Sequence, residues 1–444
     1  MTVDQQQNGE ANGLSSASSL LVLSEVIAKN ASIVSHYLEA HKLPQPSFNS
    51  DGPSIVVPGD AAQEIRQAQQ DLISAALKLS QLAIGPSEFL PQLATGFHYI
   101  SCLEYLCQYD IFHRVPLHDA ISYVDLANVT GVPEQRLKSV IRMAMTNALF
   151  REEPDGKHVR HSATSAFLAS DSGVHNYASY MCARSAPMAL SMAAAHKKWG
   201  ADTMRTYETA YNAAFKTDLP FFDHIGRDKE LRIQFPKYMN HVRSSSGLNL
   251  KHLVDGVAWQ NLPDGGTVVD VGGSTGGTAI ALAKAFPHLN FIVQDLPVNA
   301  ENGRKAAADS LPSDILSRLK FQGHDFTNPQ PVKGADIYLL RMILHDWPDT
   351  ECVTILKKIV AAMDNSKSRL LIMDTVLPKP GSMPVSVERV ARARDLTMLQ
   401  MGNSKERDLE DWNGLIRATD EGLELVNVVE PFGSTMAVLE VKLR

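Results

Sequence analysis

From Thr267 onward, short apolar segments alternate with helical segments, and this alternation limits the possible folds more than any other feature. The apolar segments are TVVDVGG, NFIVQDLP, LKFQGHDF, ADIYLL and RLLIMDTV, and segments with a helical pattern such as TAIALAKAF and ECVTILKKIVAAM stand between them. Parallel strands need a long crossover between them, which is usually a helix. The pattern therefore predicts an α/β fold built on a parallel sheet.

The first of these strands ends in a glycine-rich segment, DVGGSTGG (Asp270–Gly277), which opens the next helix. Glycines let the backbone approach a ligand closely, and the N-terminus of the helix presents unpaired N–H groups to it. The segment is not a Walker A loop, because it lacks GKS or GKT. It also departs from GxGxxG, because residue 271 is valine where that pattern needs glycine. Alone, it predicts only a ligand-binding turn.

Acidic residues close the next two strands. Asp295 ends the second strand in FIVQDLP, where an acid can accept both ribose hydroxyls of an adenosine group. Asp325 ends the third strand in GHDF and is placed to reach the adenine amino group. Either acid alone could be a helix N-cap or a solvated loop residue. Because three successive strands carry the pattern, we expect a cofactor that contains adenosine.

The region from Phe97 to about Ser172 predicts a winged helix-turn-helix, with a turn at Thr130–Gly131 and Pro133 in the first turn of the second helix. In DNA-binding proteins that second helix enters the major groove. Here its basic residues have acidic neighbours, and the net charge is −7. This balance disfavours nucleic acid as a partner, so we expect a role in dimerisation or as a substrate lid.

Composition sets the expected compartment. The four cysteines show no CxxC spacing and no density of a disulfide framework, which favours a reducing cytoplasm. The N-terminal residues 1–18 are polar, predict a disordered tail and do not resemble a signal peptide. No apolar run approaches the ~18–20 residues of a membrane helix, so no membrane partner is expected.

Six motifs occur in the order of a known family. VVDVGGSTGG, IVQDLP, GHDF, RMILHDWPD, LLIMDTVLP and GNSKERD resemble those of the class I S-adenosylmethionine-dependent O-methyltransferases of the plant caffeate/flavonoid type and their fungal polyketide relatives. Upstream, the winged-helix segment and PFFDHIG…FPKYM resemble the dimerisation and substrate-lid parts of that family. The resemblance implies S-adenosylmethionine as cofactor, a Rossmann-like domain with a mostly parallel seven-stranded sheet, a winged-helix dimerisation domain and a homodimer.

The same resemblance sets the expected domain boundaries. Residues 1–60 form a tail and a helical extension similar to one in fungal members, and residues 61–180 form the winged-helix dimerisation domain. Residues 181–260 form a helical lid and connector, and residues 261–444 form the methyltransferase domain.

Carried over residue by residue, the resemblance implies six cofactor contacts, which are Gly272, Gly273, Asp295, Asp325, Phe326 and Arg341. The glycines would face the methionine part, Asp295 the ribose, and Asp325 with Phe326 the adenine. Arg341 stands where plant members usually have lysine, and a planar guanidinium bonds differently from an ammonium.

His345 in RMILHDWPD matches the general base of the family, and Asp374 and Glu406 match acids that orient it. A phenol, with a pKa near ~10, must lose its proton before it attacks a methyl group. Histidine suits this task because its unperturbed pKa of ~6.5 leaves it basic at neutral pH, and a carboxylate fixes its tautomer. His241 and His324 are alternative bases, and Asp346 is expected to cap the following helix or bond to backbone.

Three functions are considered from these residues and from the family resemblance, which alone implies the second. The first is an O-methyltransferase acting on a phenolic or enolic hydroxyl of an aromatic, polyketide-type secondary metabolite, in a pocket lined by Phe235, Met239, Met342 and Met398. The second is a pericyclase or dehydratase of the same fold that binds S-adenosylmethionine without transferring the methyl group. The third is a winged-helix regulator that senses a nucleotide. No cluster with metal-ligand spacing occurs, so no metal is expected.

Overall fold

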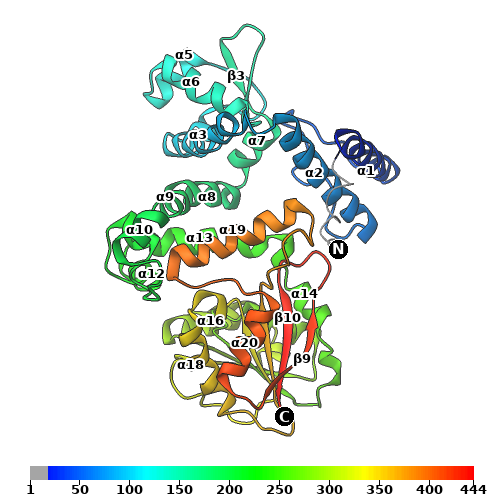
Figure 1. Cartoon of the computed structure of the whole chain (residues 1–444), viewed down its shortest axis with the longest axis vertical. Coiled ribbons are helices and arrows are strands. Elements are labelled where there is room, and N and C mark those ends of the chain that lie inside the picture. The colour runs from blue at the N-terminus through cyan, green and yellow to red at the C-terminus, as the bar shows by residue number, and fades with distance from the viewer. Residues whose placement is uncertain (1–18) are drawn as a thin grey trace, which may run out of the picture. The chain divides into compact units, whose positions relative to one another are not determined.

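The computed structural model describes residues 19–444, which form two compact units (Figure 1). One unit comprises the described residues up to Ala183 together with Pro380–Arg389, and the other comprises Arg184–Lys379 with Val390–Arg444. The tail predicted for residues 1–18 lies outside the described residues. The helical connector after Ala183 belongs to the same unit as the large sheet.

The first unit is mostly helical. Its helices and strands are α1 (Leu20–Ala40), α2 (Gln63–Ile84), α3 (Phe89–Gln108), α4 (Ile111–Arg114), β1 (Ile121–Ser122), α5 (Tyr123–Thr130), α6 (Glu134–Met145), β2 (Arg151–Glu152), β3 (His158–Arg160), α7 (Ala163–Ser170) and α8 (Ser172–Tyr180). A π-helix, Met181–Ser185, follows α8.

Local sequence explains the helix-turn-helix at α5 and α6. Ser122 caps α5, and Gly131 ends that helix in the left-handed conformation (φ +71°), which glycine adopts without steric cost. Pro133 stands immediately before α6. The strands pair in the order β1-β3-β2 and form the wing. Arg142 of α6 bonds to Glu152 of β2 (Nε–Oε1 2.8 Å), so one basic side chain of the second helix is held against the wing.

The second unit contains the large sheet and the helices around it. Its helices are α9 (Ala186–Leu190), α10 (Met192–Trp199), α11 (Ala210–Phe215), α12 (Phe221–Arg227), α13 (Leu231–Ser244), α14 (Lys251–Gly256), α15 (Gly277–Ala285), α16 (Pro297–Ser310), α17 (Ser313–Leu316), α18 (Asp349–Val360), α19 (Val385–Gly402), whose first residues lie in the other unit, and α20 (Leu409–Thr419). Its strands are β4 (Thr267–Val271), β5 (Asn290–Asp295), β6 (Leu319–Gly323), β7 (Ile337–Arg341), β8 (Arg369–Asp374), β9 (Leu423–Val429) and β10 (Ala437–Leu443).

The seven strands form one sheet in the order β6-β5-β4-β7-β8-β10-β9. Neighbours from β6 to β8 pair in parallel, and β10 pairs antiparallel with both β8 and β9. The chain reverses at β4, where it crosses from one half of the sheet to the other, and ligands of open α/β sheets bind outside the carboxyl ends of the strands at such a point. The prediction of a mostly parallel seven-stranded sheet is confirmed.

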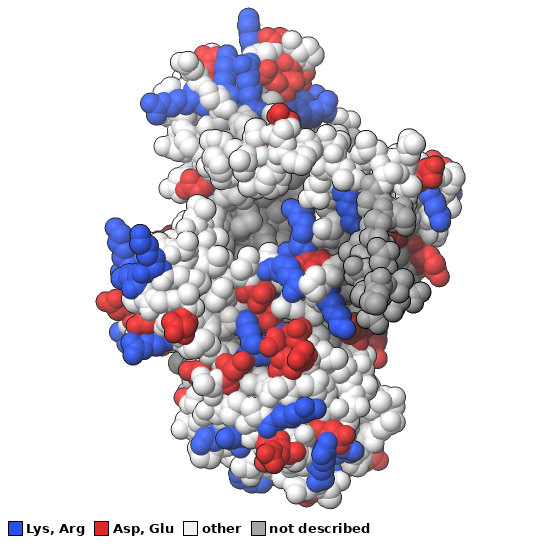
Figure 2. Space-filling model, in the orientation of Figure 1, with Lys and Arg blue, Asp and Glu red and all other residues white. Residues whose placement is uncertain are grey.

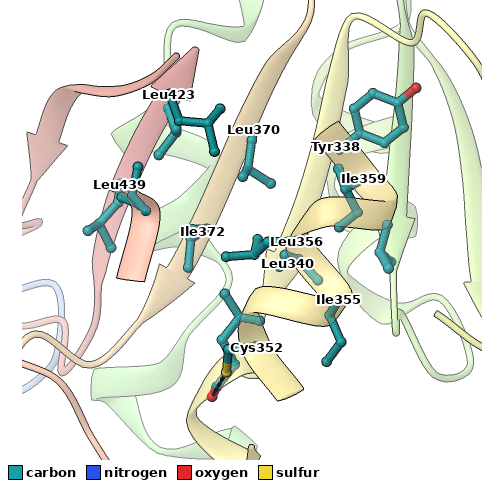
Figure 3. Packing of buried hydrophobic residues seen from close by; sticks show 14 of the residues in the cluster. Tyr338, Leu340, Cys352, Ile355, Leu356, Ile359, Leu370, Ile372, Leu423 and Leu439 are labelled. Carbon is teal, nitrogen blue, oxygen red and sulfur yellow. Dashed lines mark hydrogen bonds between the residues drawn. The ribbon is translucent and has the colours of Figure 1, made fainter. Parts of the chain in front are cut away.

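Helix α18 covers one face of this sheet (Figure 3). Its buried residues follow helical spacing, which places one apolar stripe against the sheet, and they are Cys352, Ile355, Leu356 and Ile359. They pack on Leu340 of β7 and on Leu370 and Ile372 of β8. Burying each Leu or Ile side chain contributes roughly 1.5–3 kcal/mol, so the strands that end at the site form a rigid platform.

Within residues 19–444, we find no helix that is both long enough and apolar enough to cross a membrane.

Candidate active site

The carboxyl ends of five parallel strands lie along one edge of the sheet. Gly272 follows β4, Asp295 ends β5, Arg341 ends β7 and Asp374 ends β8. Because these strands are parallel and in one sheet, residues far apart in sequence meet at this edge.

The glycine turn after β4 is too tight for side chains. Gly272 has φ +75°, and a Cβ at that position would lie 2.5 Å from Cδ1 of Ile343. A Cβ on Gly273 would lie 2.5 Å from Oδ2 of Asp270. Both glycine N–H groups donate to the carbonyl of Gln294 on β5 (2.8 and 3.0 Å). The turn therefore presents bare backbone at the sheet edge, as close approach of a ligand requires.

The carboxylate of Asp295 joins this turn to α16. Its Oδ2 accepts the N–H of Ser274 (2.7 Å), and its Oδ1 accepts the N–H of Leu296 (2.8 Å) and the side-chain amide of Asn299 (2.7 Å). A carboxylate offers about four acceptor sites. Three are used, so the group is fixed in position and keeps capacity for a hydroxyl.

Asp325 and Phe326 follow β6, and the structure places them differently. Asp325 is exposed, and its Oδ1 accepts the N–H and the hydroxyl of Thr327 (2.9 and 2.7 Å). Phe326 is half-buried, packs edge-on against Trp347 (ring centroids 5.9 Å apart), and has an edge carbon 3.6 Å from the point where a Cβ of Gly272 would lie. Phe326 thus flanks the glycine turn directly.

Arg341 reaches out of the sheet to the carbonyl of Leu248 (Nη2–O 2.6 Å). Burial lowers the pKa of Arg341, and the nearby carboxylate of Asp270 opposes this shift. Asp270 is 2% exposed, and its Oδ2 has no hydrogen-bond partner among the described residues. Burial raises the pKa of Asp270 to about 7, although Arg341 acts in the other direction.

Sequence reasoning gave Asp270 no role of its own. The available signal was its place in β4, one residue before the strand ends at the glycine turn. In the structure Asp270 and Arg341 interact electrostatically. Arg341 acts to lower the pKa of Asp270, and Asp270 acts to raise the pKa of Arg341.

His345 lies in a 3₁₀ turn, Leu344–Asp346, that follows β7. Its side chain is 12% exposed, and Nδ1 lies 3.1 Å from Oε1 of Glu406 and 3.7 Å from Oδ1 of Asp374. His345 follows β7, Asp374 ends β8 and Glu406 follows α19. The structure therefore brings together the three side chains that the sequence suggested for catalysis.

A third carboxylate, Asp346, also faces the ring, with Oδ1 3.6 Å from Nε2 of His345. Of the two expected roles of Asp346, capping the following helix is wrong, and a bond to backbone stays a prediction. Pro348 precedes α18 at the cap position, and no side-chain cap bond is made there. The 3₁₀ turn directs the Asp346 carboxylate back toward the imidazole instead.

The pKa values of the two buried acids, Asp374 and Glu406, shift in opposite directions. Burial lowers the pKa of His345, but the carboxylates of Asp374, Asp346 and Glu406 outweigh it and raise that pKa to about 10. Burial raises the pKa of Asp374 to about 7, with His345 opposing. Burial also acts to raise the pKa of Glu406, but the hydrogen-bonded His345 lowers it overall. Glu406 is thus the ionised partner of the imidazole, and Asp374 takes up a proton near neutral pH.

The four proposed pocket residues do not lie in one cluster. Phe235 and Met398 belong to one cluster, built around Tyr211, Phe221 and Met401. Met342 packs against the sheet. Met239 is half-buried on α13 and belongs to neither cluster. Phe235 and Met398 therefore pack against the same cluster, whereas Met342 and Met239 do not. Among residues 19–444, no group of three or more His, Cys, Asp or Glu side chains is arranged to hold a metal ion.

Known proteins share this sequence and fold. Residues 193–422 match the model of the O-methyltransferase domain family. O-methyltransferase pgmB from Aspergillus terreus is 63% identical over 429 residues, which cover 97% of each chain. The fold is similar to that of OxaC in complex with sinefungin and meleagrin, with a TM-score of 0.74 and 22% identity over 96% of this chain and 99% of that one. It is also similar to a structure described as a pericyclic reaction enzyme, with a TM-score of 0.70 and 22% identity over 95% of this chain and 100% of that one.

The chain therefore belongs to the O-methyltransferase domain family, and it is an S-adenosylmethionine-dependent O-methyltransferase. The sequence-based recognition of this family and cofactor is confirmed. The two solved structures share the fold with this chain, and at this identity they carry no conclusion about its substrate.

Proposed function

We propose that this enzyme methylates a phenolic or enolic hydroxyl of an aromatic, polyketide-type secondary metabolite, with His345 as the general base. The observation that carries the proposal is the imidazole of His345, 12% exposed, 3.1 Å from Glu406 and on the same sheet edge as the glycine turn. A base beside a methyl-donor site is what activation of a neutral hydroxyl requires.

The residues at the sheet edge fit S-adenosylmethionine. The turn at Gly272 and Gly273 leaves no room for side chains, Asp295 keeps a free acceptor site for a ribose hydroxyl, and Phe326 offers a flat apolar surface beside the turn. We propose that these residues hold the cofactor, with Asp325 and Arg341 completing the set. When bound, the cofactor supplies an electrophilic methyl group.

The geometry also supports a direction for the proton. Nδ1 of His345 faces Glu406, so in the neutral imidazole, which forms at alkaline pH, the Nδ1–H donates to that carboxylate and Nε2 is the acceptor. The substrate hydroxyl gives its proton to Nε2, which leaves its oxygen as the nucleophile. Bound S-adenosylmethionine would supply the methyl group to that oxygen and would leave as the thioether S-adenosylhomocysteine, its C–S bond broken. The carboxylates of Asp374, Asp346 and Glu406 raise the pKa of His345, which makes the neutral imidazole a stronger base toward a phenol. Glu406 stabilises the imidazolium that forms.

The test is His345→Gln, assayed with S-adenosylmethionine labelled in the methyl group and a panel of phenols. Loss of the base should lower kcat on the order of 10²- to 10⁴-fold, with the cofactor Kd unchanged. His324→Gln and His241→Gln, the alternative bases, serve as controls and should keep near wild-type turnover. Full label transfer by His345→Gln would refute the general-base role. Product that the wild-type enzyme forms without label would favour the pericyclase or dehydratase instead.

We also propose that the enzyme is a homodimer through its N-terminal unit. Helix α3 exposes large apolar side chains at near-helical spacing, with Phe89, Leu90, Leu93 and Phe97 between 55% and 69% exposed. An exposed apolar stripe of this kind is typical of a protein–protein interface. A second copy of the chain is the partner that the family resemblance implies.

A further inference from the structure

Arg407 directly follows Glu406, and its side chain is fully buried. Arg407 is not one of the residues that we propose to contact substrate or cofactor. Its guanidinium is directed at the turn that carries His345, so the segment Glu406–Arg407 faces that turn with two adjacent side chains.

The guanidinium bonds to the backbone on both sides of His345. Nη1 donates to the carbonyl of Leu344, one residue before the histidine (2.9 Å), and Nη2 donates to the carbonyl of Trp347, two residues after it (3.0 Å). Nε and Nη2 also donate to Oδ1 of Asp349 in the first turn of α18 (2.9 and 2.7 Å). The guanidinium thus contacts the backbone before His345, the backbone after it and the first turn of α18.

The turn needs such support, because its backbone departs from favoured geometry. Met342 has φ +56°, a left-handed conformation that is rare for a bulky side chain. Strain of this kind persists only where neighbouring structure over-determines the backbone. Cys352 also donates to the carbonyls of Leu344 and Trp347 (3.1 and 3.3 Å), but a thiol is a weak donor. Arg407 is therefore the strongest donor to this turn.

Arg407 is itself held to the strand end that carries Asp374. Its carbonyl accepts the N–H of Leu377 (2.8 Å), and a parallel bridge joins it to Val376, just after β8. These backbone contacts fix Arg407 beside the end of β8, which is the strand end that carries Asp374.

We propose that Arg407 is a positioning residue for methyl transfer, which holds the His345 turn so that the imidazole stays between Glu406 and Asp374 with Nε2 available to the substrate. The proposal rests on the proposed role of His345 as general base. Arg407 touches neither substrate nor cofactor and acts through the backbone of that turn. A lysine cannot replace it, because a single ammonium lacks the planar fork that reaches two carbonyls and a carboxylate together.

The first variant is Arg407→Lys, which keeps the charge and removes the fork. We expect kcat to fall on the order of 10- to 100-fold while the KM and Kd for S-adenosylmethionine stay within about twofold, because displacement of a catalytic group by about 1 Å has an effect of this size. We also expect the pH at which kcat/KM reaches half its plateau to move down. When the ring moves away from Asp374, Asp346 and Glu406, those carboxylates raise the pKa of His345 less.

A merely structural role gives a different result. Partial misfolding lowers the amount of active enzyme but leaves the pH of half-maximal rate unchanged, and this outcome would overturn the proposal. Arg417→Lys, the same substitution at an exposed position of α20, is the matched control and should retain wild-type values.

Asp349→Asn is the second variant, and it decides the matter if Arg407→Lys does not fold. Asp349 is half-exposed, so its amide is tolerated, but the change weakens the anchor of the guanidinium. We expect a smaller loss of kcat, about 3- to 10-fold, with the same downward shift of the pH profile. Unchanged kcat and an unchanged profile in this variant would overturn the proposal.

A double variant separates this proposal from the proposed function. If Arg407 acts through His345, adding Arg407→Lys to His345→Gln should lower residual label transfer by less than about twofold. If Arg407→Lys lowers label transfer as much in the His345→Gln background as in the wild type, the positioning role of Arg407 is contradicted and the general-base role of His345 is not. Wild-type activity of His345→Gln would instead contradict the general-base role.

Discussion

At the scale of single residues, two buried carboxylates flank the same imidazole but differ in geometry. Glu406 is within hydrogen-bond distance of Nδ1 of His345 at 3.1 Å, whereas Asp374 is at 3.7 Å and its Oδ2 accepts the N–H of Leu344 (3.2 Å). Glu406 therefore fixes the tautomer of His345. Asp374 stabilises the positive charge of the imidazolium and, through the N–H of Leu344, the turn that carries His345.

Glu406→Gln tests this division. An amide oxygen can still accept the Nδ1–H, but it does not stabilise the imidazolium, so kcat should fall on the order of 100-fold with little change in cofactor binding. Single-turnover label transfer measures the effect on the chemical step. A loss of cofactor affinity with an unchanged chemical step would contradict the role given to Glu406.

Asp374→Asn should change the pH dependence of the reaction. Asp374 is the strongest of the carboxylates that raise the pKa of His345 to about 10, and protonated His345 cannot accept a proton. Activity of the wild type should therefore rise with pH through the alkaline range. Because the variant lowers the pKa of His345, the rise in kcat/KM should occur at lower pH than in the wild type. A profile that does not move, measured with the same phenol, would contradict the coupling.

The three candidate catalytic residues came from the family resemblance, because each stands in one of its motifs, RMILHDWPD, LLIMDTVLP or GNSKERD. The roles of Asp270 and Arg407 could not be predicted in this way. The significance of Arg407 arises from its contacts with Leu344 and Trp347, which are distant in sequence and adjacent only after the sheet forms. No local pattern records such a contact.

At the scale of elements, the strand and helix alternation predicted the sheet because apolar runs and helical periodicity are local properties. The left-handed Met342 and the 3₁₀ turn Leu344–Asp346 were not predicted. Their sequence does not favour this conformation, and tertiary contacts impose it. The glycine turn was predicted because glycine marks such a conformation directly.

Gly272→Ala is expected to harm both this turn and cofactor binding. At φ +75°, alanine is strained by roughly 1–2 kcal/mol, and its Cβ would lie 2.5 Å from Ile343. Both the free energy of unfolding and the affinity for S-adenosylmethionine should decrease, as measured by urea denaturation and calorimetric titration.

Gly414→Ala is the matched control. Gly414 lies within α20, and a Cβ there would meet no heavy atom within 4 Å. Alanine has the higher helix propensity, so this variant should be as stable as the wild type or more stable, by up to about 1 kcal/mol. Equal effects of the two substitutions would show that the turn at Gly272 imposes no special constraint.

At the scale of the whole molecule, charge and exposed apolar surface suggest different partners. On the face of the sheet-containing unit in the lower part of Figure 2, acidic and basic side chains are interspersed and do not form a continuous basic band. With a net charge of −7, this favours a small-molecule substrate over nucleic acid. The domain boundaries at residues 60, 180 and 260 remain predictions from the family resemblance.

The exposed stripe of α3 yields the last prediction. Leu93 is 58% exposed near the middle of the stripe, so Leu93→Glu places a charge in the apolar interface that we propose between two copies. The variant should be a monomer by light scattering at concentrations at which the wild type is a dimer. Leu409→Glu is the matched control, because Leu409 is 43% exposed at the start of α20, where a negative charge is tolerated. A wild type that is monomeric at every concentration, or a Leu93→Glu variant that remains dimeric, would show that α3 does not hold two copies together.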